Sequence, residues 1–205
     1  MFDRLATDLL APLLRGCARP IARVGIGADA LTLTGFAVGL AGSGAIALNH
    51  PLAGLALILA NRLMDGLDGA VARLGRPTDR GAFLDIALDF LFYASVPLGF
   101  AVADPAAHAL PAAVLLAAFV GTGSSFLAFA ILAGRRGIVS TRLPAKGFHY
   151  LGGLTEGTET LVCFAAMCIW PGLFAPLALG FAVLCAITVA TRLWAGWRLL
   201  GDGPG

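Results

Sequence analysis

Six apolar stretches constrain the fold of this chain more than any other feature of its sequence. They lie at about residues 30–48, from 51 into a group of aspartates, and at 81–102, 110–133, 153–170 and 174–194. Each approaches the roughly 20 residues that an α-helix needs to cross the hydrocarbon core of a bilayer. Of the 205 residues, 59% are hydrophobic, whereas about 45–50% is usual for a soluble domain. We therefore predict a single all-α membrane domain over residues 1–205, with a bundle of six transmembrane helices at 28–200.

Basic residues occur in alternate connections between these stretches, and this pattern predicts the orientation. The basic positions are Arg4, Arg15, Arg19 and Arg23, then Arg73, Arg76 and Arg80, then Arg135, Arg136, Arg142 and Lys146, and finally Arg192 and Arg198. The three other connections contain no Lys or Arg, and Arg62 is the only basic residue that we place inside a span. Because Lys and Arg are enriched in cytoplasmic loops, both termini are predicted to be cytoplasmic. The net charge of +2 gives no indication of nucleic-acid binding.

The N-terminal residues show a different pattern. Over residues 2–15, Phe2 and several leucines gather on one helical face, and the charged residues fall largely elsewhere. This distribution is typical of an amphipathic helix in the membrane interface, which we predict within residues 1–24; a short soluble cap is the alternative. All but one of the 14 basic residues are arginine. Together with abundant Ala, Gly and Leu, this bias favours a bacterial source and hence the inner membrane.

Four aspartates stand at the predicted cytoplasmic ends of the second and third spans. They are Asp65, Asp68, Asp85 and Asp89. Acidic residues beside lipid-facing helices are costly, so they usually have a function. Residues three or four apart share one face of a helix, so two antiparallel helices can direct two carboxylates each into one cleft. Small residues at positions 69, 72 and 81 leave space for a ligand on those faces.

Ionised carboxylates grouped in a partly dry cleft repel one another. Two unit charges 4 Å apart cost about 4 kcal/mol at an effective dielectric near 20. Protonation, pairing with arginines or bound cations can relieve this repulsion. Oxygen ligands favour Mg²⁺, Mn²⁺ or Ca²⁺, and Arg73, on the same face as Asp65, would then suit a phosphate. The alternative is a charged hairpin whose acids pair with Arg62, Arg73, Arg76 and Arg80.

The stretch from Asp65 to Asp89 resembles the signature of the CDP-alcohol phosphotransferase family, D-x2-D-G-x2-A-R-x7–8-G-x3-D-x3-D. Every fixed position is filled, with a seven-residue spacer before Gly81. The resemblance is weaker before the first span, where Ala28-Asp29-Ala30-Leu31-Thr32 stands in place of the family's Pro-Asn-x-Leu-Thr. We still expect Asp29 to cap the first transmembrane helix.

The resemblance implies roles for the residues of the signature. Asp65, Asp68 and Asp85 would hold two divalent cations, Mg²⁺ or Mn²⁺, and Asp89 would be a further metal ligand. Asp89 would also act as the general base on the acceptor hydroxyl. The cytidine and phosphates of a CDP-linked donor would bind at Gly69, Ala72, Arg73 and Gly81.

The implied protein is a metal-dependent enzyme of phospholipid biosynthesis that faces the cytoplasm. It would transfer a phosphatidyl group from CDP-diacylglycerol to a polar alcohol and release CMP. Glycerol 3-phosphate is the acceptor that we expect first; inositol phosphate, serine or choline remain open, as does a CDP-choline or CDP-ethanolamine donor with diacylglycerol. The family also implies a homodimer. A divalent-cation transporter is the alternative from another class, but it predicts acidic residues near the bilayer midplane rather than at one end.

Several other polar residues have roles that the sequence leaves open. Asn61 lies one turn before Asp65 and either orients a carboxylate, contacts the nucleotide or bonds to a neighbouring helix. Asp79 is interpreted as solvated in a loop, and His149 as interfacial. The candidates for acceptor binding are Arg135, Arg136, Arg142, Lys146, Glu156 and Glu159. For these, topology signals, contacts to anionic lipid or helix N-terminal acids are the alternatives.

Overall fold

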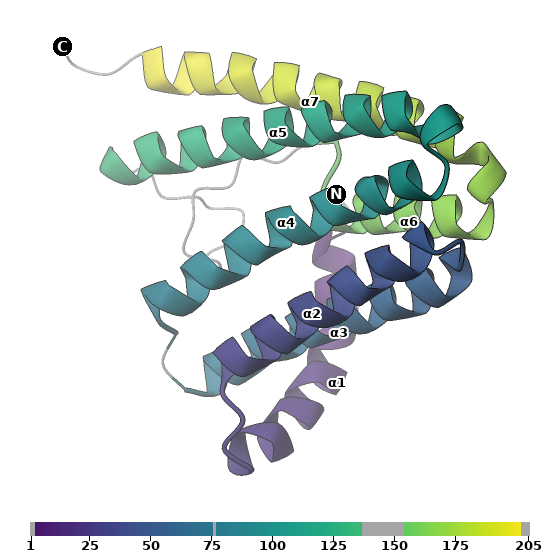
Figure 1. Cartoon of the computed structure of the whole chain (residues 1–205). Helices are drawn as coiled ribbons and strands as arrows, with labels where there is room; N and C mark the ends of the chain where they lie inside the picture. Colours follow the sequence, from purple (N-terminus) through teal and green to yellow (C-terminus); the bar gives the residue numbers. More distant parts are fainter. Residues whose placement is uncertain (1–2, 76, 137–153, 202–205) are drawn as a thin grey trace.

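The computed structural model describes residues 3–75, 77–136 and 154–201, and it is helical almost throughout (Figure 1). The elements are α1 (Asp3–Arg23), α2 (Ala28–Ala47), α3 (Pro51–Leu74), α4 (Asp79–Ala103), α5 (Pro105–Arg135), α6 (Gly157–Ile169), the short 3-10 helix η2 (Pro171–Leu173) and α7 (Phe174–Gly201). These described residues contain no strand, so the predicted all-α fold is confirmed.

Among the described residues, four segments are long and apolar enough to cross a membrane, namely α2, α4, α5 and Pro171–Gly201. α3 has 24 residues but carries Arg62, Asp65, Asp68 and Arg73 from its middle onward. α6 has 13 residues, a length of about 20 Å at 1.5 Å per residue, whereas the hydrocarbon core is about 30 Å thick. The exact count of six spans and the cytoplasmic termini therefore remain predictions.

α6 begins at Gly157, later than the start near residue 153 that the sequence suggested. The reason is a capping box at this end of the helix. The Glu159 carboxylate accepts a hydrogen bond from the Glu156 backbone N–H at 3.2 Å, and the Glu156 side chain accepts one from the Glu159 backbone in return. This reciprocal pairing fixes the helix start, and it confirms both residues as helix N-terminal acids.

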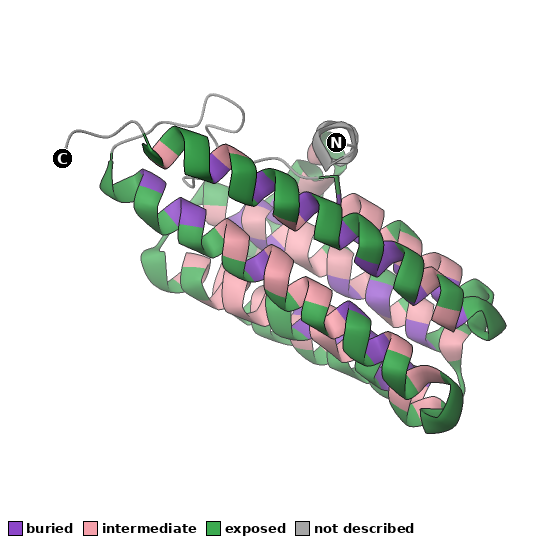
Figure 2. Cartoon of the chain, turned by 90° about the horizontal axis from the view of Figure 1, so that it is seen from above, coloured by how far each residue is buried: buried purple, intermediate pink, exposed green. Residues whose placement is uncertain are grey.

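The long helices α2, α3, α4, α5 and α7 each bury one side in the bundle and expose the other (Figure 2). The main core contains Phe92 and Phe100 of α4, which pack with Phe164, Met167 and Phe174 of the C-terminal part. Many large apolar side chains face outward on every long helix. Soluble monomers rarely expose so much contiguous apolar surface, so this outer surface suits contact with lipid.

α2 packs closely against α3 and α4 because small residues lie at the contacts. A Cβ atom on Gly39 would lie 2.6 Å from the Phe92 ring, and one on Gly99 would lie 2.6 Å from the Ser43 carbonyl oxygen. Only glycine permits approaches this close. The three helices therefore form a tight unit at whose end the four aspartates lie.

α1 packs beside the C-terminal part of α3. Ala18 is fully buried against Ala70 and Val71, and a Cβ atom on Gly66 would lie 3.0 Å from the Leu14 side chain. The helix expected near the N-terminus is thus present and extends to Arg23. Its location in the membrane interface remains a prediction.

Arg192 is more buried than a place near the end of the sixth span suggested. We expected it near the end of the sixth span, which left Arg62 as the only basic residue inside a span. α7 instead continues to Gly201, so Arg192 lies within the helix with 8% of its surface exposed. Its Nη1 donates a hydrogen bond to the Thr122 carbonyl oxygen of α5 at 3.1 Å. This bond compensates part of the cost of burying a charge and joins α7 to α5.

Candidate active site

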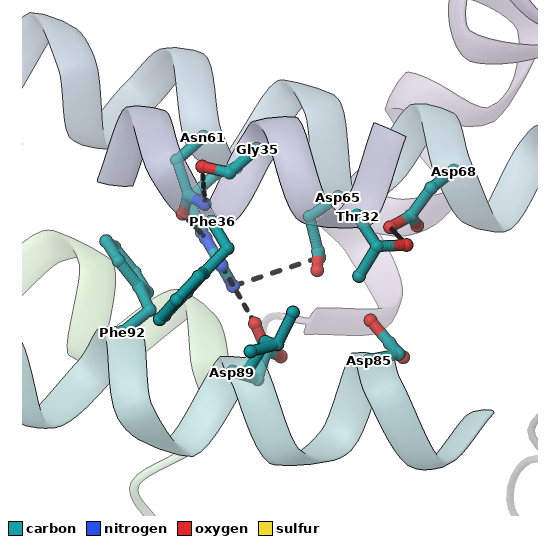
Figure 3. Close-up of a pocket in the computed structure, with 11 residues that line it drawn as sticks. Thr32, Gly35, Phe36, Asn61, Asp65, Asp68, Asp85, Asp89 and Phe92 are labelled. Atoms are coloured by element: carbon teal, nitrogen blue, oxygen red, sulfur yellow. Dashed lines mark hydrogen bonds and ion pairs between the residues drawn. The ribbon is translucent and has the colours of Figure 1, made fainter. Parts of the chain in front are cut away.

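All four aspartates line one pocket between α2, α3 and α4 (Figure 3). Asp65 and Asp68 come from α3, and Asp85 and Asp89 come from the facing turns of α4. α2 closes one side of the pocket with Thr32, Gly35 and Phe36. The structure therefore brings the carboxylates together as their helical spacing predicts.

Three of the carboxylates form a compact group. Asp65, Asp68 and Asp85 each offer an oxygen, and these three atoms lie within 4.8 Å of one another. Asp68 is buried, and its Oδ2 accepts a hydrogen bond from Thr32 Oγ1 at 2.6 Å. Negative charges this close repel unless a cation lies between them. An all-oxygen donor set suits Mg²⁺, Mn²⁺ or Ca²⁺, so the chemistry of the group fits a divalent cation.

Asp89 lies in the same pocket but has a different partner. Its Oδ1 accepts a hydrogen bond from Arg62 Nη2 at 2.8 Å, while Arg62 Nη1 lies 3.8 Å from Asp65 Oδ2. The Arg62 side chain is 14% exposed, and those of Asp65 and Asp89 are each 34% exposed. Asp89 is thus held beside the three-carboxylate group by a largely buried ion pair, and its role as a metal ligand remains a prediction.

Arg62 is itself fixed by neighbours on three sides. Its Nε donates to Asn61 Oδ1 at 2.7 Å, and its Nη1 donates to the Tyr93 hydroxyl at 3.2 Å. The guanidinium carbon lies 4.4 Å from the centre of the Phe92 ring. Asn61 is buried and donates from Nδ2 to the Gly35 carbonyl oxygen of α2 at 2.8 Å. Asn61 therefore bonds to a neighbouring helix and orients an arginine rather than a carboxylate.

The small residues of the signature lie outside the lining of this pocket. The Arg73 guanidinium folds over Gly69, where a Cβ atom would lie 3.3 Å from Arg73 Nη1. Gly81 is next to Thr78 and Asp29, each 3.2 Å from the position of a Cβ atom. Arg73 is exposed, and Ala72 is partly buried. Their contact with a nucleotide remains a prediction.

We expected Asp29 to cap α2, but it does not. Gly27 holds the N-cap position, and Asp29 lies within the first turn. Its Oδ2 accepts a hydrogen bond from Arg80 Nη2 at 2.6 Å. The carboxylate is therefore drawn to a charge at the start of α4 rather than to the backbone of its own helix.

The secondary candidates are scattered around the molecule. Arg136 donates from Nη1 to the Leu200 carbonyl oxygen at 2.6 Å, so it caps the C-terminal end of α7. Arg135 is exposed, as is Asp79, which is the first residue of α4 rather than a loop residue. Three further candidates lie outside the described residues: Arg142, Lys146 and His149.

Two contacts that shape this site were not predicted from the sequence. Thr32 was noted only as part of a weak resemblance, although its hydroxyl bonds to Asp68. Arg62 was considered only as a charge that could neutralise acids. Its place three residues before Asp65 on an apolar helix was the available signal, because a buried arginine needs a partner.

Comparison with known protein families decides the assignment. A family described as CDP-alcohol phosphatidyltransferase matches residues 26–194 of the chain. The chain belongs to the CDP-alcohol phosphatidyltransferase family. This membership confirms the resemblance in the signature and identifies a membrane transferase of phospholipid biosynthesis, rather than a transporter.

Curated relatives of this CDP-alcohol phosphatidyltransferase are bacterial and archaeal. The inner membrane protein YnjF of Escherichia coli is 52% identical over 200 residues, which cover 98% of this chain and 97% of that protein. Archaetidylinositol phosphate synthase of Methanothermobacter thermautotrophicus is 48% identical over 82 residues, which cover 39% of this chain and 42% of that protein. The first relative and the apolar helices support a multi-pass protein of the bacterial inner membrane.

Solved structures of the family show the same fold. The phosphatidylinositol phosphate synthase of Mycobacterium tuberculosis, in a crystal structure with CDP-DAG bound, has a TM-score of 0.68 and 25% identity. The match covers 91% of this chain and 94% of that one. The same enzyme in complex with manganese and citrate also has a TM-score of 0.68, over 90% of this chain and 88% of that one.

Proposed function

We propose that this protein transfers the phosphatidyl group of CDP-diacylglycerol to a phosphorylated polyol and releases CMP. One observation carries the proposal: Asp65, Asp68 and Asp85 gather their oxygens within 4.8 Å in a pocket that Asp89 also lines. This is the arrangement that a charged diphosphate donor needs, since cations must offset its charge. The CDP-DAG bound to the mycobacterial enzyme supports the choice of donor.

Two divalent cations, Mg²⁺ or Mn²⁺, are part of the proposal. Asp65, Asp68 and Asp85 would hold them, and manganese in the complex of the mycobacterial enzyme supports this chemistry. When bound, the cations would neutralise the donor's diphosphate and the charge that develops on departing CMP. Thr32 supports the set from α2, because its hydrogen bond fixes the orientation of the Asp68 carboxylate.

Asp89 is the proposed general base. Its carboxylate accepts the proton of the acceptor hydroxyl as that oxygen bonds to the phosphorus of the phosphatidyl group. The bond from this phosphorus to the oxygen of CMP breaks, and CMP leaves with its electron pair. Gly69, Ala72, Arg73 and Gly81 are proposed to receive the nucleotide and its phosphates.

For the acceptor we propose inositol phosphate, in place of the glycerol 3-phosphate that we expected from sequence. The archaeal relatives and the mycobacterial neighbour are named as synthases of inositol phosphate lipids. Both acceptors carry a phosphate and a free hydroxyl, so a basic group on the cytoplasmic side would serve either. A cytoplasmic site and a homodimer belong to the same proposal.

The reaction is tested in membranes that contain the protein, given CDP-diacylglycerol labelled in its phosphatidyl group and Mn²⁺. Inositol phosphate, glycerol 3-phosphate, inositol, serine and choline are compared as acceptors, with membranes lacking the protein as the control. We expect a labelled phosphoinositol lipid and an equal amount of CMP. A product with another acceptor would replace the proposed acceptor. Absence of CMP with every acceptor would overturn the proposed reaction.

Thr32→Val tests the support of Asp68 from α2. Valine has nearly the same shape but removes the hydroxyl that bonds to Asp68 Oδ2. Loss of such an outer contact typically weakens metal affinity about 10- to 100-fold, so half-maximal activity should require about tenfold more Mn²⁺. Thr34→Val is the matched control, because the Thr34 hydroxyl donates a hydrogen bond within its own helix, to the Ala30 carbonyl oxygen. Equal Mn²⁺ requirements for both variants would contradict the role of Thr32.

A further inference from the structure

A stripe of three arginines runs along the outer side of α1. Arg15, Arg19 and Arg23 are spaced four residues apart, and all three are exposed. At 3.6 residues per turn they lie within about 80° of one another around the helix axis. Among the described side chains, no ion pair includes any of the three. The stripe therefore presents three positive charges in a row to whatever covers this helix.

Another side of α1 packs on the part of α3 that carries two of the aspartates. Ala18 is fully buried against Ala70 and Val71, and a Cβ atom on Gly66 would lie 3.0 Å from the Leu14 side chain. Small side chains form most of this contact, and hydrophobic stabilisation grows with the apolar area buried. What covers the outer side of α1 therefore contributes to holding it against α3.

The direction of α1 differs from that of the other long helices. In Figure 1 it runs across them, and in Figure 2 it is seen nearly end-on beside them. The turn after it fixes this direction. The Ile26 N–H donates to the Ile21 carbonyl oxygen at 3.3 Å and the Gly25 N–H to that of Ala22 at 3.1 Å, with Gly25 at a φ of 84°. These are the two bonds of a Schellman motif, which ends a helix at a glycine. When the long helices span the bilayer, α1 lies along its surface.

Apolar residues near the stripe suit the same setting. Leu13 is 68% exposed, and Val24 and Ile26, just after α1, are 78% and 43% exposed. In a helix at the membrane surface, such side chains enter the acyl region while arginines stay at the level of the lipid phosphates. The helix dipole accounts for Arg23 alone, since its effect falls off within the last turn.

We propose that Arg15, Arg19 and Arg23 form a binding surface for the phosphate headgroups of anionic phospholipids, and that bound headgroups hold α1 against α3. Guanidinium groups form strong, paired hydrogen bonds with phosphate oxygens. A zwitterionic lipid binds this surface less well, because a positive charge lies beside its phosphate. The competing view is that the three arginines only set the orientation of the chain in the membrane.

Amide hydrogen exchange of α1 in the full-length protein separates these views. The protein is reconstituted in nanodiscs of phosphatidylcholine, or of phosphatidylcholine and phosphatidylglycerol in equal amounts, without donor, acceptor or divalent cations. Exchange over residues 11–23 should be slower by about tenfold or more in the mixed lipid, because opening of α1 must first release the headgroups. High salt should reduce this difference, since it screens exposed charges. The readout requires no catalysis, so it is independent of the proposed reaction.

Variants of the stripe locate the effect. The triple variant Arg15→Gln, Arg19→Gln and Arg23→Gln should exchange equally in both lipids. Arg19→Gln alone should reduce the difference about fivefold, which corresponds to about 1 kcal/mol for each basic residue near an anionic surface. Arg198→Gln is the matched control for this single change. Arg198 is also exposed, but it lies over the Trp194 ring in α7, so the lipid dependence of α1 should be unchanged.

Three results would overturn the proposal. The first is equal exchange of α1 in both lipids for the unmodified protein. The second is a triple variant that keeps the lipid dependence, which would assign it to other charges. The third is slower exchange when inorganic phosphate is added to phosphatidylcholine nanodiscs, which would indicate a site for a free anion instead of a lipid surface. If the triple variant does not fold, equal lipid dependence of Arg19→Gln and Arg198→Gln would likewise refute the surface.

Discussion

Asp89→Asn should lower CMP release by about 10³-fold while leaving the fold intact. Asparagine has the same shape as aspartate, and its Oδ1 can still accept the hydrogen bond from Arg62. It cannot take a proton from the acceptor hydroxyl, and general base catalysis typically contributes about 10²- to 10⁴-fold. The measurement is the initial rate of CMP release by purified protein at saturating donor, acceptor and Mn²⁺.

Asp104→Asn is the matched control for this substitution. Asp104 caps α5 by accepting a hydrogen bond from the Ala107 backbone N–H at 3.1 Å. Asparagine is an equally good N-cap, so its rate should be unchanged. Thermal unfolding in detergent should be the same for both variants. Near-normal turnover of Asp89→Asn would remove Asp89 from the role of base.

Removal of divalent cations should stop the reaction completely and reversibly. The oxygens of Asp65, Asp68 and Asp85 lie within 4.8 Å of one another, and a diphosphate donor would add further negative charge to the same pocket. Without cations this repulsion excludes the donor, since two charges 4 Å apart cost about 4 kcal/mol at an effective dielectric near 20. We expect activity below detection in excess EDTA and full recovery on adding excess Mn²⁺ or Mg²⁺.

The control for chelation is EDTA that has been saturated with Mn²⁺ beforehand, which should have no effect. Donor binding gives a second readout, because labelled CDP-diacylglycerol should be retained by the protein only when Mn²⁺ is present. Sustained CMP release in excess EDTA would refute the metal dependence.

The helices and the grouping of the acids could be predicted because both depend on periodicity along one chain. Hydrophobic runs mark α2, α4, α5 and α7, and a spacing of three or four residues places Asp65 with Asp68 and Asp85 with Asp89. The two pairs then had to meet, because a short connection joins their helices. Periodicity and a short connection therefore sufficed to predict that the four carboxylates share one pocket, but not the lining that α2 contributes.

Contacts between helices could not be predicted in the same way. The sequence does not state how each helix is rotated about its axis, so it did not reveal that Thr32 reaches Asp68 or that Arg62 pairs with Asp89. Helix ends were uncertain for a related reason. Gly27 instead of Asp29 caps α2 because Arg80, distant in sequence, attracts the carboxylate. Arg192 was expected near the end of the span because the apolar run ends there. The helix α7 continues to Gly201.

The pocket around the four aspartates is built entirely by α2, α3 and α4 as far as its described lining extends. α5, α6 and α7 contribute none of these lining residues, and they pack onto the first unit mainly through the apolar core around Phe92 and Phe100. The described residues that line this pocket thus all lie in the N-terminal half of the chain. Substitutions in its C-terminal half that preserve the packing of Phe164 against Tyr93 should leave the carboxylates and Arg62 in their arrangement. Such independence would let this pocket persist while the C-terminal half of the chain diverges in sequence.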